Sequence, residues 1–117
     1  MSAICRLGSG SRWSDVVIYR GVARWVEVAE DRAADFGDQA RQVLRQVDET
    51  LQSLSTDRTA LLQLLVFMTD LQRIDEFNAV WDSWVPSGAA PIRACMQAGL
   101  SGGCQIEVIV EAAVSEQ

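Results

Sequence analysis

The sequence of 117 residues contains no histidine and no lysine, and these two absences exclude several kinds of active site. Without histidine, the chain cannot build a Ser-His or Cys-His nucleophilic pair or the common histidine-containing zinc sites. Without lysine, it has neither a Schiff-base residue nor an amine general base. All ten basic residues are arginine, and the net charge is −6. This balance argues against a nucleic-acid partner, which requires clustered basic side chains.

The sequence also has little that is typical of exported or membrane proteins. No stretch approaches the roughly 18 consecutive apolar residues of a membrane helix. Residues 1–12 contain no apolar run that could serve as a signal peptide. The three cysteines, Cys5, Cys95 and Cys104, are an odd number at unrelated spacings, which does not describe a disulfide framework. We therefore expect reduced thiols, no membrane partner and a cytoplasmic location.

Length and composition fit one globular domain over residues 1–117. Two short β-prone runs, residues 14–19 and 22–28, surround Gly21 and predict a hairpin. From residue 38 the apolar residues recur every three or four positions, which predicts an amphipathic helix that Asp35 or Asp38 can cap. A second stripe over residues 74–84 predicts another helix.

The remaining apolar runs predict strands. Residues 61–68 are assigned a buried strand in their second half, and residues 92–98 and 105–114 complete the chain. The order is β-β-α-β-α-β-β, an α+β layer with both helices on one face of the sheet. The other face needs cover, and three such faces packed around an axis would bury it. If the last two runs form a hairpin, Arg93 lies opposite residues 110–112 rather than opposite Glu107.

Several short motifs in a fixed order make the pattern more specific. Residues 90–95 read Ala-Pro-Ile-Arg-Ala-Cys, followed by Gly-Leu at 99–100 and Ile-Glu-Val at 106–108. Upstream are Val-Phe-Met-Thr-Asp at 66–70 and Phe-Asn-Ala-Val-Trp at 77–81. Together these motifs, from about Trp13 to Val114, resemble the RidA/YjgF family of reactive imine deaminases.

The resemblance implies a chorismate-mutase-like trimer with ligand clefts between neighbouring subunits. It also implies hydrolysis of reactive enamines and imines, of the 2-aminoacrylate type, to a 2-oxo acid and ammonia. Arg93 would then bind the substrate carboxylate and Glu107 would orient or activate water, with no metal and no organic cofactor. A guanidinium binds a carboxylate through two parallel hydrogen bonds. One carboxylate side chain next to a water molecule is enough for general base catalysis.

By the same resemblance, four further residues are expected to bind substrate: Trp13, Glu27, Asn78 and Cys95. Two of these differ from the family pattern. Trp13 stands where a tyrosine is common, and Glu27 lies in a segment that is Ser-Gly-Gln-like in the family's deaminases. A carboxylate there would oppose a substrate carboxylate or act on another substrate. The loop proline of the family is Ser101 here.

Each of these residues also has a simpler interpretation. Arg93 could be an exposed strand residue or an ion-pair partner, Glu107 a solvent-facing carboxylate, and Cys95 a small buried hydrophobe. Glu111 could modulate Glu107 or merely face water. The alternative function is a non-catalytic trimer that binds a small carboxylate metabolite. Endoribonuclease activity is the least favoured function because the chain is acidic.

Overall fold

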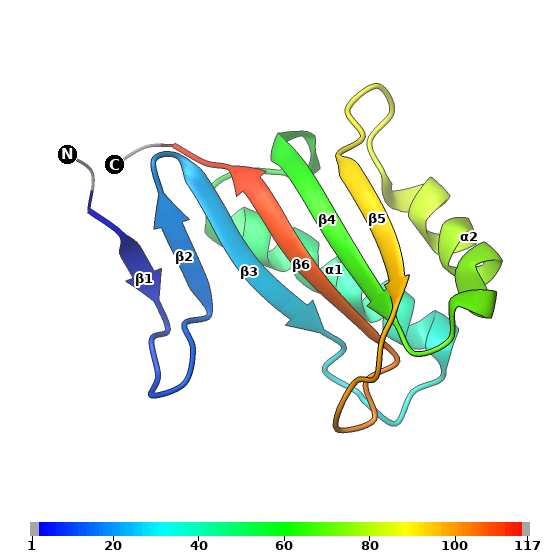
Figure 1. Ribbon diagram of the computed structural model, residues 1–117. Helices are drawn as coiled ribbons and strands as arrows, with labels where there is room; N and C mark the ends of the chain where they lie inside the picture. The colour runs from blue at the N-terminus through cyan, green and yellow to red at the C-terminus, as the bar shows by residue number, and fades with distance from the viewer. Residues whose placement is uncertain (1–2, 116–117) are drawn as a thin grey trace.

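A computed structural model describes residues 3–115 as a sheet with two α-helices (Figure 1). The strands are β1 (Cys5–Leu7), β2 (Val16–Tyr19), β3 (Val22–Val28), β4 (Leu61–Met68), β5 (Ile92–Gln97) and β6 (Ile106–Ala113). The helices are α1 (Phe36–Ser53) and α2 (Ile74–Trp84), and short 3₁₀ turns cover Arg58–Ala60 and Leu71–Arg73. The predicted α+β class is confirmed. Strand β1 is an addition that the sequence did not predict, because its three exposed residues show no alternation of buried and exposed positions.

The six strands follow the order β1-β2-β3-β6-β4-β5. Strands β4 and β5 are parallel, and the other neighbours are antiparallel. The predicted hairpin of the first two runs is β2 and β3, joined by Arg20 and Gly21, which both have positive φ. Two consecutive residues with positive φ give the turn whose twist matches a tight hairpin.

The last two strands do not form a hairpin, because β4 lies between them. The chain leaves β5 at the edge of the sheet, passes the end of β4 over residues 98–105, and enters β6 beside β3 (Figure 1). We call residues 98–105 the crossover loop. Two backbone hydrogen bonds hold it to the end of β4, from the Ala98 amide to the Met68 carbonyl and from the Thr69 amide to the Gln105 carbonyl.

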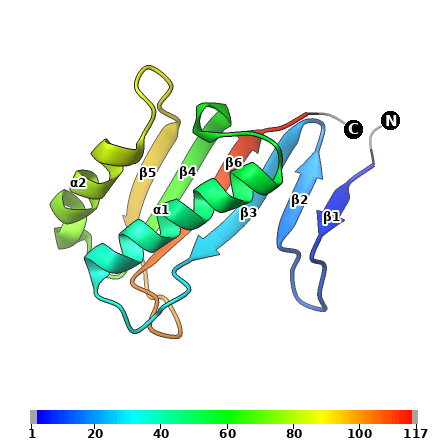
Figure 2. The same cartoon turned by 180° about the vertical axis from the view of Figure 1, so that it is seen from behind.

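Both helices lie on one side of the sheet (Figures 1 and 2). Helix α1 begins at Asp35, whose side chain accepts a hydrogen bond from the Asp38 amide, so Asp35 is the cap. The predicted apolar stripe of α1 faces the sheet, where Val43, Leu44 and Val47 are buried. Neither helix within residues 3–115 combines the length and apolar character needed to cross a bilayer.

The other side of the sheet carries no helix (Figure 1). Alternation from the buried strand positions assigns to this open face the side chains of Val22, Arg24, Val26, Val28, Leu65, Phe67, Ile92, Ala94, Met96, Glu107, Ile109 and Glu111. Most of them are apolar, and Val26 and Ile92 are 54% and 67% exposed. An apolar sheet face of this kind is costly to leave in water.

Candidate functional site

The Arg93 side chain lies on the helix side of the sheet, below α2. Its strand position pairs with the buried Leu64, which places both side chains on the same face. The guanidinium carbon lies 5.1 Å from the ring centre of Trp81 and 5.7 Å from that of Phe77. One guanidinium nitrogen donates a 2.8 Å hydrogen bond to the side-chain oxygen of Asn78. The aromatic rings and the amide fix the guanidinium in one orientation.

This half-buried arginine has no carboxylate within ion-pair distance among the residues that the structure describes. The bond to Asn78 uses one of the five guanidinium N–H groups, so most of the donors stay available. We call Arg93, Asn78, Phe77, Trp81 and Cys95 the arginine cluster. The guanidinium N–H groups that are not bonded to Asn78 can bind a carboxylate through two parallel hydrogen bonds. The interpretation of Arg93 as an ion-pair partner is therefore wrong for the described part of the chain.

Cys95 lies two residues after Arg93 on the same strand face, and its side chain is half-buried. Burial raises the pKa of the Cys95 thiol above its ordinary value, and the positive charge of Arg93 offsets part of that increase. The thiol is therefore the dominant form at neutral pH. A contact role in the arginine cluster suits this residue better than a nucleophilic one.

We expect Cys95 to be alkylated by iodoacetamide at pH 8 at least about tenfold more slowly than the exposed Cys5, because it is half-buried and carries less thiolate. Mass spectrometry of the labelled peptides measures both rates in one sample. The buried Cys104 should stay unlabelled until urea is added, which reports that the protein remained folded. Equal rates at Cys95 and Cys5 would contradict the described environment.

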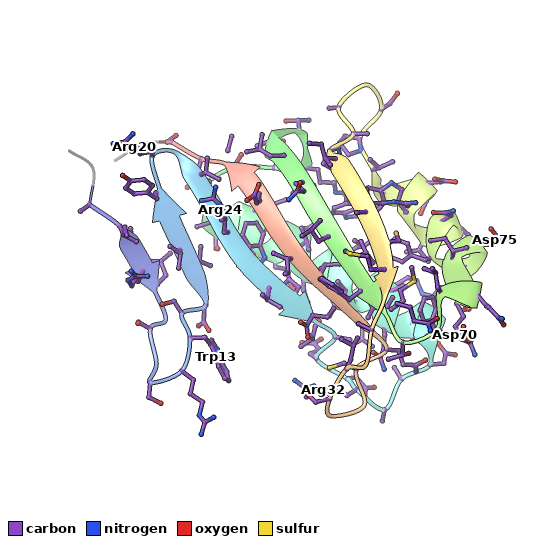
Figure 3. The ribbon with its side chains drawn as sticks, viewed as in Figure 1. Trp13, Arg20, Arg24, Arg32, Asp70 and Asp75 are labelled. Carbon is purple, nitrogen blue, oxygen red and sulfur yellow. The ribbon has the colours of Figure 1, made fainter. Side chains whose placement is uncertain are left out.

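A second group of predicted residues lines a cleft of about 640 Å³ at the C-terminal end of β3. Strand β2 pairs with β3 only as far as Trp25, so the edge of β3 is free beyond that residue. The lining of this β3 cleft comprises Trp13, Ser14, Asp15, Val16, Trp25, Val26, Glu27, Val28, Thr50, Ser101 and Glu107. Trp13 is 71% exposed and lies on the loop between β1 and β2, on the side that faces the end of β3 (Figure 3).

The two glutamates of the β3 cleft have different surroundings. The Glu27 carboxylate turns to α1, where it accepts hydrogen bonds of 2.7 Å from the Thr50 hydroxyl and 3.1 Å from the Gln46 amide. Glu107 lies on the open face, in register with Val28 on one side and Phe67 on the other. Neither glutamate forms an ion pair within residues 3–115. Glu107 therefore keeps its lone pairs for a water or a ligand, whereas Glu27 is already held by the helix.

Glu111 has a partner that the sequence did not suggest. Its carboxylate accepts a 2.7 Å hydrogen bond from Arg24 on the neighbouring strand, and the two residues are directly in register. The pair lies on the open face. This contact makes Glu111 a cross-strand ion-pair residue within the sheet.

One chain does not bring Arg93 and Glu107 together. Arg93 is in register with Leu64, and Leu64 is in register with Val110, so β4 separates the strand of Arg93 from that of Glu107. A hairpin that places Arg93 directly opposite residues 110–112 is therefore wrong. Glu107 is an odd number of positions from Val110, so its side chain points to the opposite face of the sheet. The two strands are also separated by two strand spacings, about 10 Å. Three predicted residues thus lie in the arginine cluster and three in the β3 cleft.

Sequence reasoning missed most of the other residues that surround these groups. It assigned Trp81 to the core or an interface; the residue is buried, but it also supports the Arg93 guanidinium. The four-residue spacing of Phe77 and Trp81 around Asn78 is the signal that could have indicated one helix face above Arg93. Thr50 carried no local signal, because it enters the β3 cleft from α1, far in sequence from β3 and from the Trp13 loop, whereas Asp15 lies only two residues after the predicted Trp13. Among the described residues, no group of three acidic or cysteine side chains is arranged to hold a metal ion.

Comparison with known proteins agrees with this fold. A family model described as Endoribonuclease L-PSP matches residues 8–114. The chain belongs to this family. The RutC family protein YoaB of Escherichia coli K12 is 34% identical over 112 residues, which cover 95% of this chain and 98% of the relative. The resemblance to the RidA/YjgF family is confirmed by these relatives and by the solved structures.

Two solved structures place this family member among close structural neighbours. A crystal structure from Pseudomonas aeruginosa superimposes with a TM-score of 0.90 at 33% identity and covers 97% of this chain and 100% of its own. NMB1025 of Neisseria meningitidis, described as a member of the YjgF protein family, has a TM-score of 0.88 at 28% identity. It covers 98% of both chains. The α+β fold of this chain is therefore shared with YjgF-family neighbours.

Proposed function

We propose that this protein hydrolyses reactive enamine or imine intermediates, of the 2-aminoacrylate type, to a 2-oxo acid and ammonia. Arg93 binds the substrate carboxylate, and Glu107 orients and activates the attacking water. The observation that carries the proposal is the half-buried Arg93 guanidinium, which is held by two aromatic rings and Asn78 and lacks a carboxylate partner among the described residues. A site without histidine, lysine or metal suits this reaction, because a 2-imino acid is already electrophilic and needs only an anchor, a water and a proton exchanger.

The proposed site is shared between two chains. Arg93 and Glu107 point to opposite faces of one sheet, so they can act on one small substrate only if different subunits supply them. The apolar open face gives a physical reason for assembly, since packing it against a neighbour removes it from water. A homotrimer with the β3 cleft of one subunit facing the arginine cluster of the next would meet both requirements. Closed cyclic symmetry would then create three equivalent sites.

Each step of the reaction has a candidate group. The Arg93 fork fixes the substrate carboxylate and thereby the adjacent imine carbon. Glu107 accepts a proton from water as the oxygen attacks that carbon, which gives a carbinolamine. The imine nitrogen takes up that proton as the carbinolamine forms. The hydroxyl proton of the carbinolamine then passes through Glu107 to the amino group, while the C=O bond forms and the C–N bond breaks, so that ammonia and the 2-oxo acid leave. Cys95, Trp13, Glu27 and Asn78 line the two halves, and Asn78 acts by holding Arg93.

The proposal is tested by generating imino acids in the assay with an amino-acid oxidase and following 2-oxo acid release. The purified protein should shorten the lifetime of the imine, which semicarbazide trapping measures directly. Acceleration with several apolar imino acids would support the proposal. No acceleration, combined with saturable binding of a 2-oxo acid, would favour the alternative of a non-catalytic trimer that binds a carboxylate metabolite.

The family model's description names endoribonucleases, and RNA cleavage is therefore a necessary control. We do not propose this activity, because the net charge is −6 and the groups that line the β3 cleft include three carboxylates and no arginine. RNA cleavage that is lost in an Arg93→Met variant would overturn that assignment.

A further inference from the structure

Gln39, in the first turns of α1, is the one fully buried polar residue of the described chain. Its amide nitrogen donates to the carbonyls of Ala34 at 3.0 Å, Arg32 at 3.2 Å and Gly103 at 3.2 Å. Its amide oxygen accepts a 2.9 Å hydrogen bond from the backbone N–H of Gln105. One side chain therefore joins the segment between β3 and α1 to the crossover loop between β5 and β6.

These two segments run side by side at the end of the sheet where β3 stops (Figures 1 and 2). Gly102 and Gly103 both have positive φ, and the two backbones approach closely at Gly103, while Gly102 lies against the Arg32 side chain. A Cβ on Gly103 would lie 3.1 Å from the Arg32 carbonyl oxygen, and one on Gly102 would overlap the Arg32 guanidinium. The junction is thus built for one relative position of the two segments, and Gln39 fills its centre.

The crossover loop carries Ser101, which lines the β3 cleft together with Val26 and Val28. Ser101 is exposed, and it lies two residues before Gly103, whose carbonyl accepts from Gln39. Glu107, in contrast, is fixed by the ladders of β6 with both β3 and β4. Loss of the Gln39 contacts would therefore move the Ser101 wall of the cleft while leaving Glu107 in place.

We propose that Ser101 is a ligand-binding residue of the β3 cleft and that Gln39 is the positioning residue that sets its place. This inference rests on the proposed function in using the β3 cleft as half of the ligand site. It adds a specificity group: the Ser101 hydroxyl can donate to or accept from a polar atom on the ligand. Ligands with a hydroxyl, amide or carbonyl beyond the carboxylate are the class that such a wall selects over purely apolar ones.

The test is a double-mutant cycle on ligand binding, measured by titration calorimetry with a hydroxyl-bearing 2-oxo acid and with 2-oxobutanoate. Ser101→Ala should raise the Kd of the hydroxyl-bearing ligand about fivefold and leave that of 2-oxobutanoate nearly unchanged. Gln39→Met keeps the size of the side chain and removes all four hydrogen bonds. It should raise the Kd of the hydroxyl-bearing ligand by a similar factor and leave that of 2-oxobutanoate nearly unchanged. The double variant should bind the hydroxyl-bearing ligand no worse than either single variant, because both changes remove the same interaction, that between Ser101 and the ligand hydroxyl.

Additive effects in the cycle, or a Gln39→Met variant that binds both ligands as the wild type does, would overturn the inference. If Gln39→Met does not fold, Gly103→Ala disturbs the same junction from the exposed loop, where a Cβ would meet the Arg32 carbonyl. Amide hydrogen exchange at Gln105 reports the loosened junction without any ligand, and it should accelerate in both variants. If the wild type binds neither 2-oxo acid, the result counts against the proposed function itself. If amide exchange at Gln105 is unchanged in the variants, the result counts against the positioning role of Gln39.

Discussion

Replacing Arg93 with methionine should reduce kcat/KM for imine hydrolysis by a factor of roughly 30 to several thousand, which corresponds to a loss of about 2–5 kcal/mol. The reason is the loss of the charged fork that anchors the substrate carboxylate. Methionine keeps most of the packing against Phe77 and Trp81, so the fold should survive. Steady-state kinetics with imines generated in situ measure the loss, and calorimetry with a 2-oxo acid should show that binding falls as well.

Arg45→Met is the matched control, because Arg45 is an exposed arginine on the outer side of α1 that pairs with Glu30. It removes the same charge from the chain without touching either half of the site. We expect its kinetics to stay within about twofold of the wild type. Activity of Arg93→Met equal to that of Arg45→Met would contradict the role of Arg93 as the carboxylate anchor.

Replacing Glu107 with glutamine should lower kcat by about 10²- to 10⁴-fold, the usual contribution of a general base. KM and 2-oxo acid binding should change little, because the carboxylate anchor stays in place. This separation of kcat from binding distinguishes Glu107 from Arg93, whose loss affects both. Steady-state kinetics and calorimetry on the same preparation provide the comparison.

Glu111→Gln is the control for this variant, since Glu111 lies four residues along the same strand face and is engaged by Arg24. It should cost some stability through the cross-strand pair and leave kcat nearly unchanged. If Glu107→Gln keeps wild-type kcat, the protein is better described as a binding protein or uses another base.

The elements of the fold were predictable because their local signals agree. The apolar stripe from Val43 to Leu51, the cap at Asp35 and the glycine turn after Arg20 each specify a structure within a few residues. Strand neighbours were not predictable in the same way. Nothing in the sequence of β6 says that it inserts between β3 and β4, because this choice depends on which edges are free after the rest of the sheet has formed.

The site shows the same division. The resemblance identified Arg93 and Glu107, and their strands were placed correctly to within a residue or two. Arg93 and Glu107 point to opposite faces because of how β5 and β6 are each aligned with β4. A shift of either strand by one residue would place the two side chains on the same face. The support of Arg93 by Trp81 and the contact of Glu27 with Thr50 are tertiary contacts, so no local pattern in the sequence specifies them.

The most direct test of a site shared between subunits is to mix two inactive variants, Arg93→Met and Glu107→Gln, by co-refolding or co-expression. In mixed oligomers, some interfaces combine the Arg93 of one chain with the Glu107 of its neighbour. Random assembly of equal amounts should recover about a quarter of the wild-type activity, since each site draws one residue from each of two chains. Activity no higher than the mean of the two parent variants would contradict a site built from two chains.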